Sequence, residues 1–396
     1  MKINSAAFAC ASLLLLCSCA TEKPVRSRLP ADVTMNKEAG RGGMLIVTLR
    51  LESGEKLPFM VDTGASGTGF DKSLEPKLGK RTDTGTALHF GVKNEINAYA
   101  APKLYLGSTP LLMTDSNVFS YDLRQFSSNA DRPILGVLGM DVLDHYCIQL
   151  DFKARKVRFL DDEHSNKKDW GRPFSLTDTG DGRFSIGENL AGAKDSASLI
   201  DSGCNYDGWL SQPLFQQWTN QTQSPVAGEV RFPAGVLRGE TYPDINLQGF
   251  GAEALLGGDS NIVFNGIGLR FLARHLVTFD FPKQTMYLKR TSIGPLIDED
   301  MEAAGKAAAQ SAVIVLKSLN EKGRLPGWSK NDEAATKTVT FHFHYPNSLT
   351  LDLQKKGDSS IHHYEFIRAS QASPWTLQKA WQTDPNEHRV KEYPVP

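Results

Sequence analysis

The sequence predicts a mostly β protein that contains two copies of one all-β unit, followed by a small α+β domain. Between residues 43 and 290, short apolar runs of β-type residues alternate with turns rich in Gly, Pro and Asn. A motif of apolar strand, aspartate, hydroxyl residue and glycine occurs twice within these runs. From residue 299, an Ala-, Lys- and Glu-rich segment typical of a helix precedes further β-type runs.

Composition excludes some classes of protein. The chain of 396 residues carries 44 Lys and Arg against 45 Asp and Glu. A net charge of −1 excludes a broadly basic nucleic-acid binder, so we expect no nucleic-acid partner. Three of the five cysteines fall within the first nineteen residues, which excludes a scaffold held together by disulfides.

The N-terminus has the pattern of an export signal. Lys2 precedes an apolar run over residues 6–16, which is too short to span a bilayer but fits a signal peptide. Leu16-Cys17-Ser18-Cys19 resembles the bacterial lipobox, which implies a signal peptide over residues 1–18 and lipidation of Cys19. Cleavage by ordinary signal peptidase near Ala20 is the alternative. Residues 19–38 then form a tether, and no later segment is apolar enough to be a transmembrane helix.

The lipobox resemblance also implies a location. A lipid on Cys19 would anchor the protein to a membrane of the bacterial cell envelope. Ala20, rather than Asp, follows this cysteine, which by the same resemblance favours the outer membrane.

The central part of the chain contains an internal duplication. Apolar strands lead into Asp62-Thr63-Gly64 and again into Asp201-Ser202-Gly203. Each motif is followed by an apolar-apolar-Gly segment, and a second aspartate lies 12 residues after the glycine, at 151 and at 280. This matched spacing indicates two units of roughly 120 residues each. We call residues 39–161 the first repeat and residues 170–290 the second repeat.

The doubled motif resembles the pepsin/retropepsin clan of aspartic peptidases. The resemblance covers residues 43–290 and implies a bilobal all-β fold in which each repeat forms one lobe. Each lobe would contribute one aspartate at the tip of a ψ-shaped loop. The segments that end at Gly139 and Gly268 would thread these loops. Because one chain carries both motifs, we expect a monomer.

Asp62 and Asp201 are the predicted catalytic pair. Two carboxylates a few ångström apart cannot both ionise, so they share one proton. The ionised member takes a proton from a water molecule, and the neutral member donates one to the scissile carbonyl oxygen. Gly64 and Gly203 allow the tight turn and close approach that such a pair requires. The sequence thus predicts an aspartic-type endopeptidase acting on peptides or proteins, with no cofactor and no metal.

Neighbouring residues have supporting roles and also depart from the family pattern. The resemblance implies that Thr63 and Ser202 brace the loops across the lobe interface, and that Ser66 bonds the outer oxygen of the first aspartate. In the second loop, Cys204 and Asn205 stand where small and hydroxyl residues are usual. The Tyr-Gly signature of a pepsin-like flap is not visible, and residues 88–91 and 230–237 are candidate hairpins.

These departures support a second hypothesis, which is a catalytically inactive binding lipoprotein of the cell envelope with the same fold. A third possibility is that the two repeats form independent domains without a shared cleft.

Other polar residues in the repeats have structural interpretations. We expect Asp151 and Asp280 to be turn residues at strand ends, and His145 and His275 to be ordinary loop or core histidines. Cys147 and Cys204 could pair, but nothing in the sequence brings them together, so we expect two separate buried thiols.

The C-terminal segment, residues 299–396, predicts one helix packed on a meander of four or five strands. The helix is expected over residues 299–322, and the strands over 338–344, 348–353, 362–368, 375–381 and 390–393. His342 and His344 alternate along one strand, and His362-His363 lie on another. A zinc site is conceivable there, but no cysteine or carboxylate at ligand spacing supports it, so a solvated sheet face is favoured. Trp328, Trp375 and Trp381 are expected to fill a thin core rather than form a carbohydrate platform.

Overall fold

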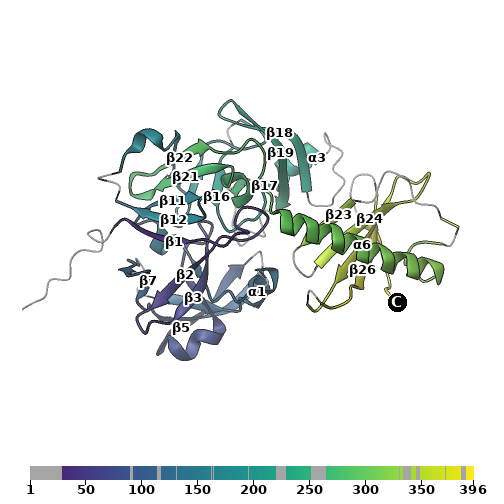
Figure 1. The fold of residues 1–396 in the computed structure, drawn as a ribbon, viewed down its shortest axis with the longest axis horizontal. Coiled ribbons are helices and arrows are strands. Elements are labelled where there is room, and N and C mark those ends of the chain that lie inside the picture. The colour runs from purple at the N-terminus through teal and green to yellow at the C-terminus, as the bar shows by residue number, and fades with distance from the viewer. Residues whose placement is uncertain are drawn as a thin grey trace, which may run out of the picture.

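The computed structural model describes most of the chain after residue 28. The described ranges are residues 29–89, 92–113, 117–130, 132–161, 163, 165–194, 196–219, 229–250, 265–329, 331–332, 340–344, 348–370, 372–384 and 389–396. The predicted signal peptide and the lipidation residue Cys19 lie outside these ranges. Within the described part the protein is mostly β, with few helices, and its strands form four sheets (Figure 1).

The first repeat forms a nine-stranded sheet. Its order is β5-β6-β9-β4-β10-β3-β2-β7-β8. The apolar strands expected around residues 44–49 and 58–61 are β2 and β3, which pair antiparallel and bury Leu49 and Phe59 completely. The elements are β2 (Ile46–Leu51), β3 (Lys56–Val61), β4 (Gly69–Asp71), β5 (Arg81–His89), β6 (Val92–Ala100), β7 (Leu104–Leu106), β8 (Thr109–Pro110), β9 (Asn117–Tyr121), α1 (Arg124–Ala130), β10 (Gly136–Leu138) and α2 (Met140–Leu143).

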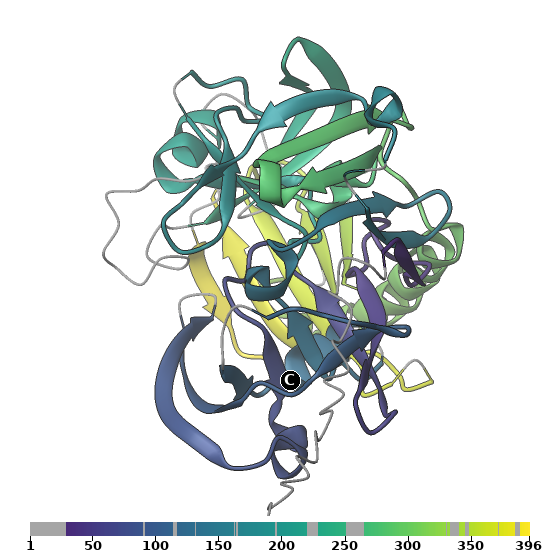
Figure 2. The ribbon, with the colours of Figure 1, turned by 90° about the vertical axis from the view of Figure 1, so that its left-hand side faces the viewer.

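The second repeat forms a seven-stranded sheet of order β14-β15-β16-β20-β17-β19-β18. Seen from the side, the strands of the first repeat lie below those of the second (Figure 2). The elements are β14 (Thr177–Asp178), β15 (Phe184–Ile186), β16 (Ser198–Asp201), β17 (Gly208–Ser211), α3 (Gln212–Thr219), β18 (Glu229–Leu237), β19 (Glu240–Phe250), β20 (Asn265–Gly268) and α5 (Leu269–Leu272).

A third sheet joins the two repeats. Its order is β1-β12-β11-β21-β22-β13, so the strands of one repeat pair directly with those of the other. At its centre Gln149 pairs with Thr278, and the Gln149 side chain donates a 3.1 Å hydrogen bond to the Thr278 hydroxyl. Gln149 follows Gly139 by ten positions, and Thr278 follows Gly268 by ten positions. The sheet thus places equivalent residues opposite each other. Its strands are β1 (Ala31–Thr34), β11 (Cys147–Asp151), β12 (Lys156–Leu160), β13 (Arg172–Ser175), β21 (His275–Asp280) and β22 (Thr285–Arg290).

One prediction about the N-terminal segment is wrong. Residues 31–34, assigned to a tether, form β1 and pair antiparallel with β12 in the joint sheet. Met35, directly after β1, is 2% exposed and belongs to the largest core cluster. The segment contains few apolar residues because β1 lies at the edge of the sheet, so the sequence pattern does not distinguish it from a linker.

Both repeats contain the same threaded arrangement. In the first repeat β10 runs parallel to β3 and antiparallel to β4, so it lies between them. In the second repeat β20 lies in the same way between β16 and β17. Gly136 and Gly266 leave room for the rings of Phe59 and Trp209, since a Cβ atom at either glycine would lie 2.2 Å from that ring. This shared topology supports the internal duplication.

The C-terminal segment forms the expected helix and meander. Helix α6 (Glu299–Glu321) lies across one face of a five-stranded antiparallel sheet (Figure 1). Ala312 and Leu316 of the helix share a buried cluster with Leu349, Tyr364 and Phe366 of the sheet. The strands are β23 (Thr340–His344), β24 (Ser348–Gln354), β25 (Ile361–Ile367), β26 (Thr376–Thr383) and β27 (Arg389–Tyr393), each within two residues of its predicted position.

The prediction of a solvated histidine face is wrong for β25. His362 and His363 are 2% and 3% exposed. His363 bonds the Asp352 carboxylate through Nδ1 at 2.8 Å and the Thr383 hydroxyl through Nε2 at 2.9 Å. Trp381 stacks on His363 with ring centroids 5.0 Å apart. Residues on the neighbouring strands thus bury this histidine. The sequence of β25 alone does not indicate which residues those are. The side chains of His342 and His344 lie outside the described part.

Two of the three tryptophans of the C-terminal segment belong to its core, whereas Trp381 stacks on His363 of the sheet. Trp375 is buried in the C-terminal core and Trp328 packs against it.

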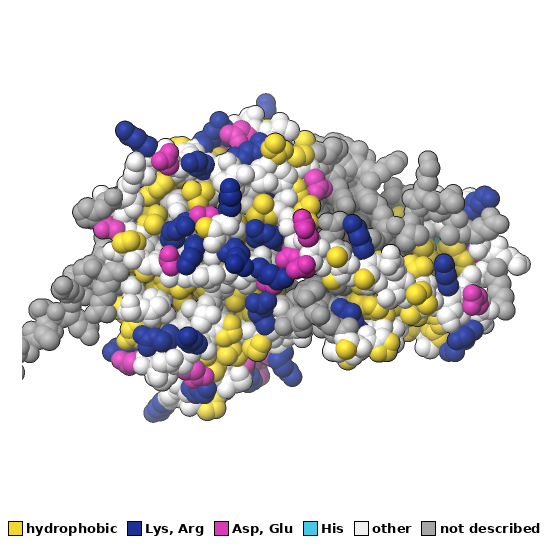
Figure 3. All heavy atoms as spheres, in the orientation of Figure 1, with side chains coloured by type: hydrophobic (Ala, Val, Ile, Leu, Met, Phe, Trp, Pro, Cys, Tyr) yellow, Lys and Arg dark blue, Asp and Glu magenta, His cyan; other side chains and the backbone are white. Residues whose placement is uncertain are grey.

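No group of three or more metal-ligating side chains occurs among the described residues. Within the same residues, no helix combines the length and apolarity needed to cross a membrane. Basic and acidic side chains are interspersed over the face shown in Figure 3.

Candidate functional site

Asp62 and Asp201 come together where two strands end. Asp62 follows β3 and Asp201 is the last residue of β16. A Cβ atom at Gly64 would lie 2.5 Å from Cγ of Asp201, and one at Gly203 would lie 2.5 Å from Cγ of Asp62. Each glycine therefore packs against the carboxyl group of the opposite repeat, at a distance that no other residue allows.

Backbone amides orient both carboxyl groups. The Gly64 N–H donates to Oδ1 of Asp62 at 2.8 Å. The Gly203 and Cys204 N–H groups donate to Oδ1 of Asp201 at 2.7 and 3.1 Å. The two loops thus hold one oxygen of each carboxyl group in equivalent ways, as expected for a duplicated motif.

The electrostatics of the pair favour a shared proton. Burial raises the pKa of Asp201 well above its ordinary value. The charge of Asp62 and a hydrogen bond with its side chain raise that pKa further, although the amides of Gly203 and Cys204 act in the opposite direction. Two buried carboxyl groups in contact cannot both carry a charge, so one proton is retained between them as the pH rises.

The hydroxyls of Thr63 and Ser202 join the two loops in a reciprocal manner. The Thr63 N–H donates to Ser202 Oγ at 3.0 Å, and the Ser202 N–H donates to Thr63 Oγ1 at 3.0 Å. The Thr63 hydroxyl also donates to the Ile200 carbonyl, and the Ser202 hydroxyl donates to the Val61 carbonyl, each at 2.8 Å. Thr63 and Ser202 are 4% and 0% exposed. Four hydrogen bonds shielded from water therefore connect the repeats directly beneath the carboxyl pair.

Gly139 and Gly268 lie where the threading strands meet the loops. A Cβ atom at Gly139 would lie 2.4 Å from the carbonyl of Gly67, and one at Gly268 would lie 2.4 Å from the carbonyl of Tyr206. The residue after each glycine donates its N–H to a loop carbonyl, at 2.9 Å in the first repeat and 2.7 Å in the second. The glycines are thus needed for close backbone approach.

Behind the loops, the two repeats use different partners at equivalent positions. In the first repeat the Thr68 hydroxyl donates to the Asp141 carboxylate at 2.6 Å. In the second, Asp207 and Arg270 occupy these positions and form an ion pair, and Arg274 binds the same carboxylate at 2.9 Å. Burial raises the pKa of Asp207, and the two arginines offset this only in part. An alignment of the two repeats places Asp207 and Arg270 opposite Thr68 and Asp141, but the aspartate motifs alone do not indicate this ion pair.

The unusual residues of the second loop are half-buried. Cys204 is a free thiol whose pKa is raised by burial and by the charge of Asp201. The other cysteine, Cys147, is buried and forms no disulfide among the described residues. Oδ1 of Asn205 is buried without a hydrogen-bond partner among the described residues. Ser66 occupies the equivalent position in the first loop, and its bond to the first aspartate stays a prediction.

Tyr121 is a neighbour of the pair that the motifs did not predict. Burial and the charge of Asp62 raise the pKa of this tyrosine. Its ring covers Gly69, where a Cβ atom would lie 2.3 Å from Cε1. Tyr121 and Ala65 also pack on a buried group that we call the Met44 cluster. Its members are Met44, Ile46, Met60, Leu123, Phe126, Ile134 and Val137.

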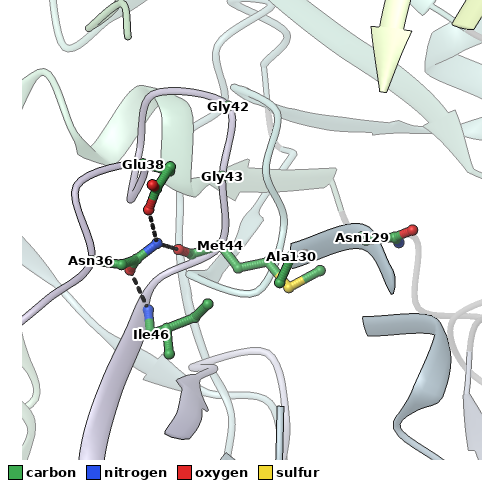
Figure 4. Close-up of a pocket in the computed structure, with 8 residues that line it drawn as sticks. All are labelled: Asn36, Glu38, Gly42, Gly43, Met44, Ile46, Asn129 and Ala130. Carbon is green, nitrogen blue, oxygen red and sulfur yellow. Dashed lines mark hydrogen bonds between the residues drawn. The ribbon is translucent and has the colours of Figure 1, made fainter. Parts of the chain in front are cut away.

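A pocket lies at the edge of the Met44 cluster (Figure 4). Asn36 supports its wall by donating to Glu38 Oε2 at 3.1 Å and to the Met44 carbonyl at 2.9 Å. Its side-chain oxygen accepts the Ile46 N–H at 2.8 Å. The lining residues are Asn36, Glu38, Gly42, Gly43, Met44, Ile46, Asn129 and Ala130.

The other polar residues singled out in the repeats form ion pairs and hydrogen bonds away from the carboxyl groups of Asp62 and Asp201. Asp151 pairs with Arg158 at 2.9 Å, and the buried Asp280 pairs with Lys167 at 2.8 Å. His275 is buried against the Phe271 carbonyl and the Tyr242 hydroxyl. Both segments named as flap candidates fall in long hairpins, β5–β6 and β18–β19, although residues 90–91 lie outside the described part. Which hairpin acts as a flap stays a prediction.

Comparison with known proteins assigns no family. No family model matches the chain, and no curated protein sequence matches it. Among solved structures, it is similar to the crystal structure of Basic 7S globulin from soybean, with 11% identity and a TM-score of 0.41. The likeness covers 67% of this chain and 95% of that chain. A likeness at this level assigns neither a family nor a function.

Proposed function

We propose that this protein is an aspartic-type endopeptidase with a bilobal, pepsin/retropepsin-like body formed by its two repeats. The contact between Asp62 and Asp201 carries the proposal. Each carboxyl group packs on the glycine of the opposite loop, and the pKa of Asp201 is raised by burial and by its neighbour. Two carboxyl groups that share one proton can act together as a general base and a general acid.

The proposed mechanism uses only groups of this chain and one water molecule. The ionised member of the pair accepts a proton from water while the oxygen of that water attacks the scissile carbonyl carbon. The neutral member donates its proton to the carbonyl oxygen, which gives a tetrahedral diol. Collapse of the diol returns a proton to the leaving amine and breaks the C–N bond. The hydrogen bonds of Thr63 and Ser202 support this chemistry by fixing the separation of the loops.

We further propose that the enzyme acts at the bacterial cell envelope, anchored by lipid on Cys19. The lipobox-like segment that ends at this cysteine supports this location. The proposed substrate is a peptide or protein, and the proposed active form is the monomer, because one chain supplies both aspartates. The pepsin-like assignment itself rests on the doubled motif and its threaded loops.

The test is cleavage of casein and of a peptide library between pH 3 and pH 7. We expect activity in the wild type, and a loss of roughly 10²- to 10⁴-fold in Asp62→Asn and in Asp201→Asn, because each substitution removes a proton-transfer group. Asp151→Asn is the matched control, since this carboxylate ends a strand and pairs with Arg158. Cleavage that survives either dyad substitution contradicts the mechanism.

The inactive binding protein is the second candidate, favoured by Asn205 of the second loop, whose buried Oδ1 has no hydrogen-bond partner in the described part of the chain. A statine-type peptide, which mimics the tetrahedral intermediate, distinguishes the two. A competent pair should bind it at least 10²-fold more tightly than the matching plain peptide. Equal affinity for both would favour the binding protein.

A further inference from the structure

An arginine of the second repeat, Arg183, contacts the loop of the first repeat that carries Asp62. Arg183 lies between β14 and β15, and its Nη1 is 3.5 Å from the carbonyl oxygen of Gly64. Gly64 in turn packs against the carboxyl group of Asp201. The side chain of Arg183 is 13% exposed. A partly accessible arginine side chain therefore contacts the Asp62 loop at the residue that packs against the Asp201 carboxyl group.

Asp181 fixes the orientation of this guanidinium. Nε and Nη2 of Arg183 both donate to Oδ2 of Asp181, at 2.9 and 2.5 Å. The other oxygen of Asp181 accepts the Thr179 hydroxyl at 2.6 Å and the Arg183 N–H at 3.2 Å. Burial opposes ionisation of Asp181, but these hydrogen bonds outweigh it and lower its pKa to about 2. One edge of the guanidinium is thus held, while Nη1 is directed toward Gly64.

The strand register shows which residue of the first repeat is equivalent to Arg183. Ser185 pairs with Leu199, and Ile46 pairs with Met60. Leu199 and Met60 each lie two residues before the aspartate of their loop. Ser185 and Ile46 are therefore equivalent.

Arg183 and Met44 each precede these residues by two positions, and each lies 18 residues before its aspartate. Met44 is 6% exposed, belongs to the Met44 cluster and lines the pocket of Figure 4. The two repeats therefore differ in chemistry at these equivalent positions. The first repeat has the apolar side chain of Met44, and the second repeat has the fixed cation of Arg183.

We propose that Arg183 is a specificity-determining residue that selects an acidic side chain of the substrate close to the scissile bond. This inference rests on the proposed endopeptidase function. Guanidinium nitrogens bind carboxylates with strong, directional hydrogen bonds, and a guanidinium that is already fixed loses little side-chain freedom on binding. The preferred substrate then carries Asp or Glu on the side of the second repeat and an apolar residue on the side of the Met44 cluster.

The experiment compares peptides that differ only by Glu or Gln at each position around the cleaved bond. At pH 6.5 a glutamate side chain is ionised, and we expect a kcat/KM ratio of about 10 or more in favour of Glu at one position. Arg183→Met, which copies the equivalent residue, should bring this ratio close to 1. Peptides with free and amidated C-termini distinguish a side-chain carboxylate from a terminal one.

Arg124→Met is the matched control. Arg124 forms the same two-residue pair with Asp122, through Nε at 2.8 Å and Nη2 at 2.5 Å, but its side chain is 87% exposed. This variant should keep the wild-type ratio. If Arg183→Met lowers kcat/KM equally for both peptides, or lowers only the melting temperature, Arg183 is a structural brace and the proposal is wrong.

Failure of the specificity proposal differs from failure of the proposed function. Cleavage that depends on Asp62 and Asp201 but shows no preference for Glu overturns only the role of Arg183. Absence of any cleavage that depends on these aspartates overturns both.

Discussion

At the scale of single residues, the two loop hydroxyls make a prediction about stability. Thr63→Val keeps the shape of the side chain but removes the oxygen that bonds the Ser202 N–H and the Ile200 carbonyl. Both groups are then buried without a partner, at a cost of roughly 1–3 kcal/mol each. We expect the free energy of unfolding in urea to fall by about 2–6 kcal/mol, and peptidase activity to fall because the two loops are no longer held in place.

Thr63→Ser is the control for this prediction. It keeps the hydroxyl and loses one methyl group, so we expect a loss of about 1 kcal/mol. Equal destabilisation by Thr63→Val and Thr63→Ser would show that the hydroxyl contributes little.

The sequence predicted residues of the site that belong to the repeated motif and missed those that reach it from elsewhere. Asp62 and Asp201 stand in recognisable local patterns, and the structure brings them together. Tyr121 approaches the loops from β9 and Arg183 from the segment between β14 and β15, because only the folded sheets bring these segments near the loops. Their identity depends on tertiary contacts, and a local pattern contains no information on them.

At the scale of elements, helix α6 allows a prediction about stability, because it carries one buried and one exposed aliphatic residue two positions apart. Leu316 is 4% exposed and packs in the C-terminal core, whereas Ile314, two residues earlier, is 67% exposed. Leu316→Ala should lower the free energy of unfolding by about 2–5 kcal/mol, because it removes transfer energy and leaves a cavity. Ile314→Ala should change it by less than about 0.5 kcal/mol. Urea unfolding followed by tryptophan fluorescence measures both.

The same comparison tests how the helix is attached. Similar losses for the two variants would mean that α6 does not bury the face that carries Leu316.

Elements were predictable where turns and apolar runs define them. The strands β23 to β27 are separated by Pro-, Gly- and Asn-containing turns, and their positions follow from these. Strand β1 and the buried face of β25 were not predictable in this way. The burial of β1 comes from pairing with β12, and that of His363 from Asp352, Thr383 and Trp381, which are distant in sequence.

At the scale of the whole molecule, the repeats are joined twice. The six-stranded sheet pairs β11 with β21, and the loop hydroxyls join the carboxyl-bearing loops. The largest buried cluster also contains side chains of both repeats. This shared core argues against two independent domains. The C-terminal segment has a buried cluster of its own, formed by α6 and the five-stranded sheet.

Each of these two buried clusters has a neutral histidine beside it. Burial lowers the pKa of His275 to about 4, and burial together with the charge of Lys355 lowers that of His362 to about 4. His275 bonds the Tyr242 hydroxyl, whereas neither ring nitrogen of His362 has a hydrogen-bond partner among the described residues. His362 lies instead between aromatic rings, since it stacks on Tyr393 and meets Trp328 edge-on.

These histidines predict a loss of stability in acid. In the unfolded chain their pKa is near 6.5, so between about pH 6.5 and pH 4 the unfolded state binds protons that the folded state does not. Stability is therefore full above pH 6.5 and falls as the pH approaches 4, by on the order of 3 kcal/mol for each histidine. His362→Phe retains the aromatic contacts without the nitrogens, so we expect it to remove about half of this pH dependence. Melting temperatures at pH 7 and pH 4.5 measure the effect, with His145→Phe as a half-buried control. Identical pH dependence in the wild type and His362→Phe would show that this histidine does not limit stability in acid, the pH range in which cleavage is to be tested.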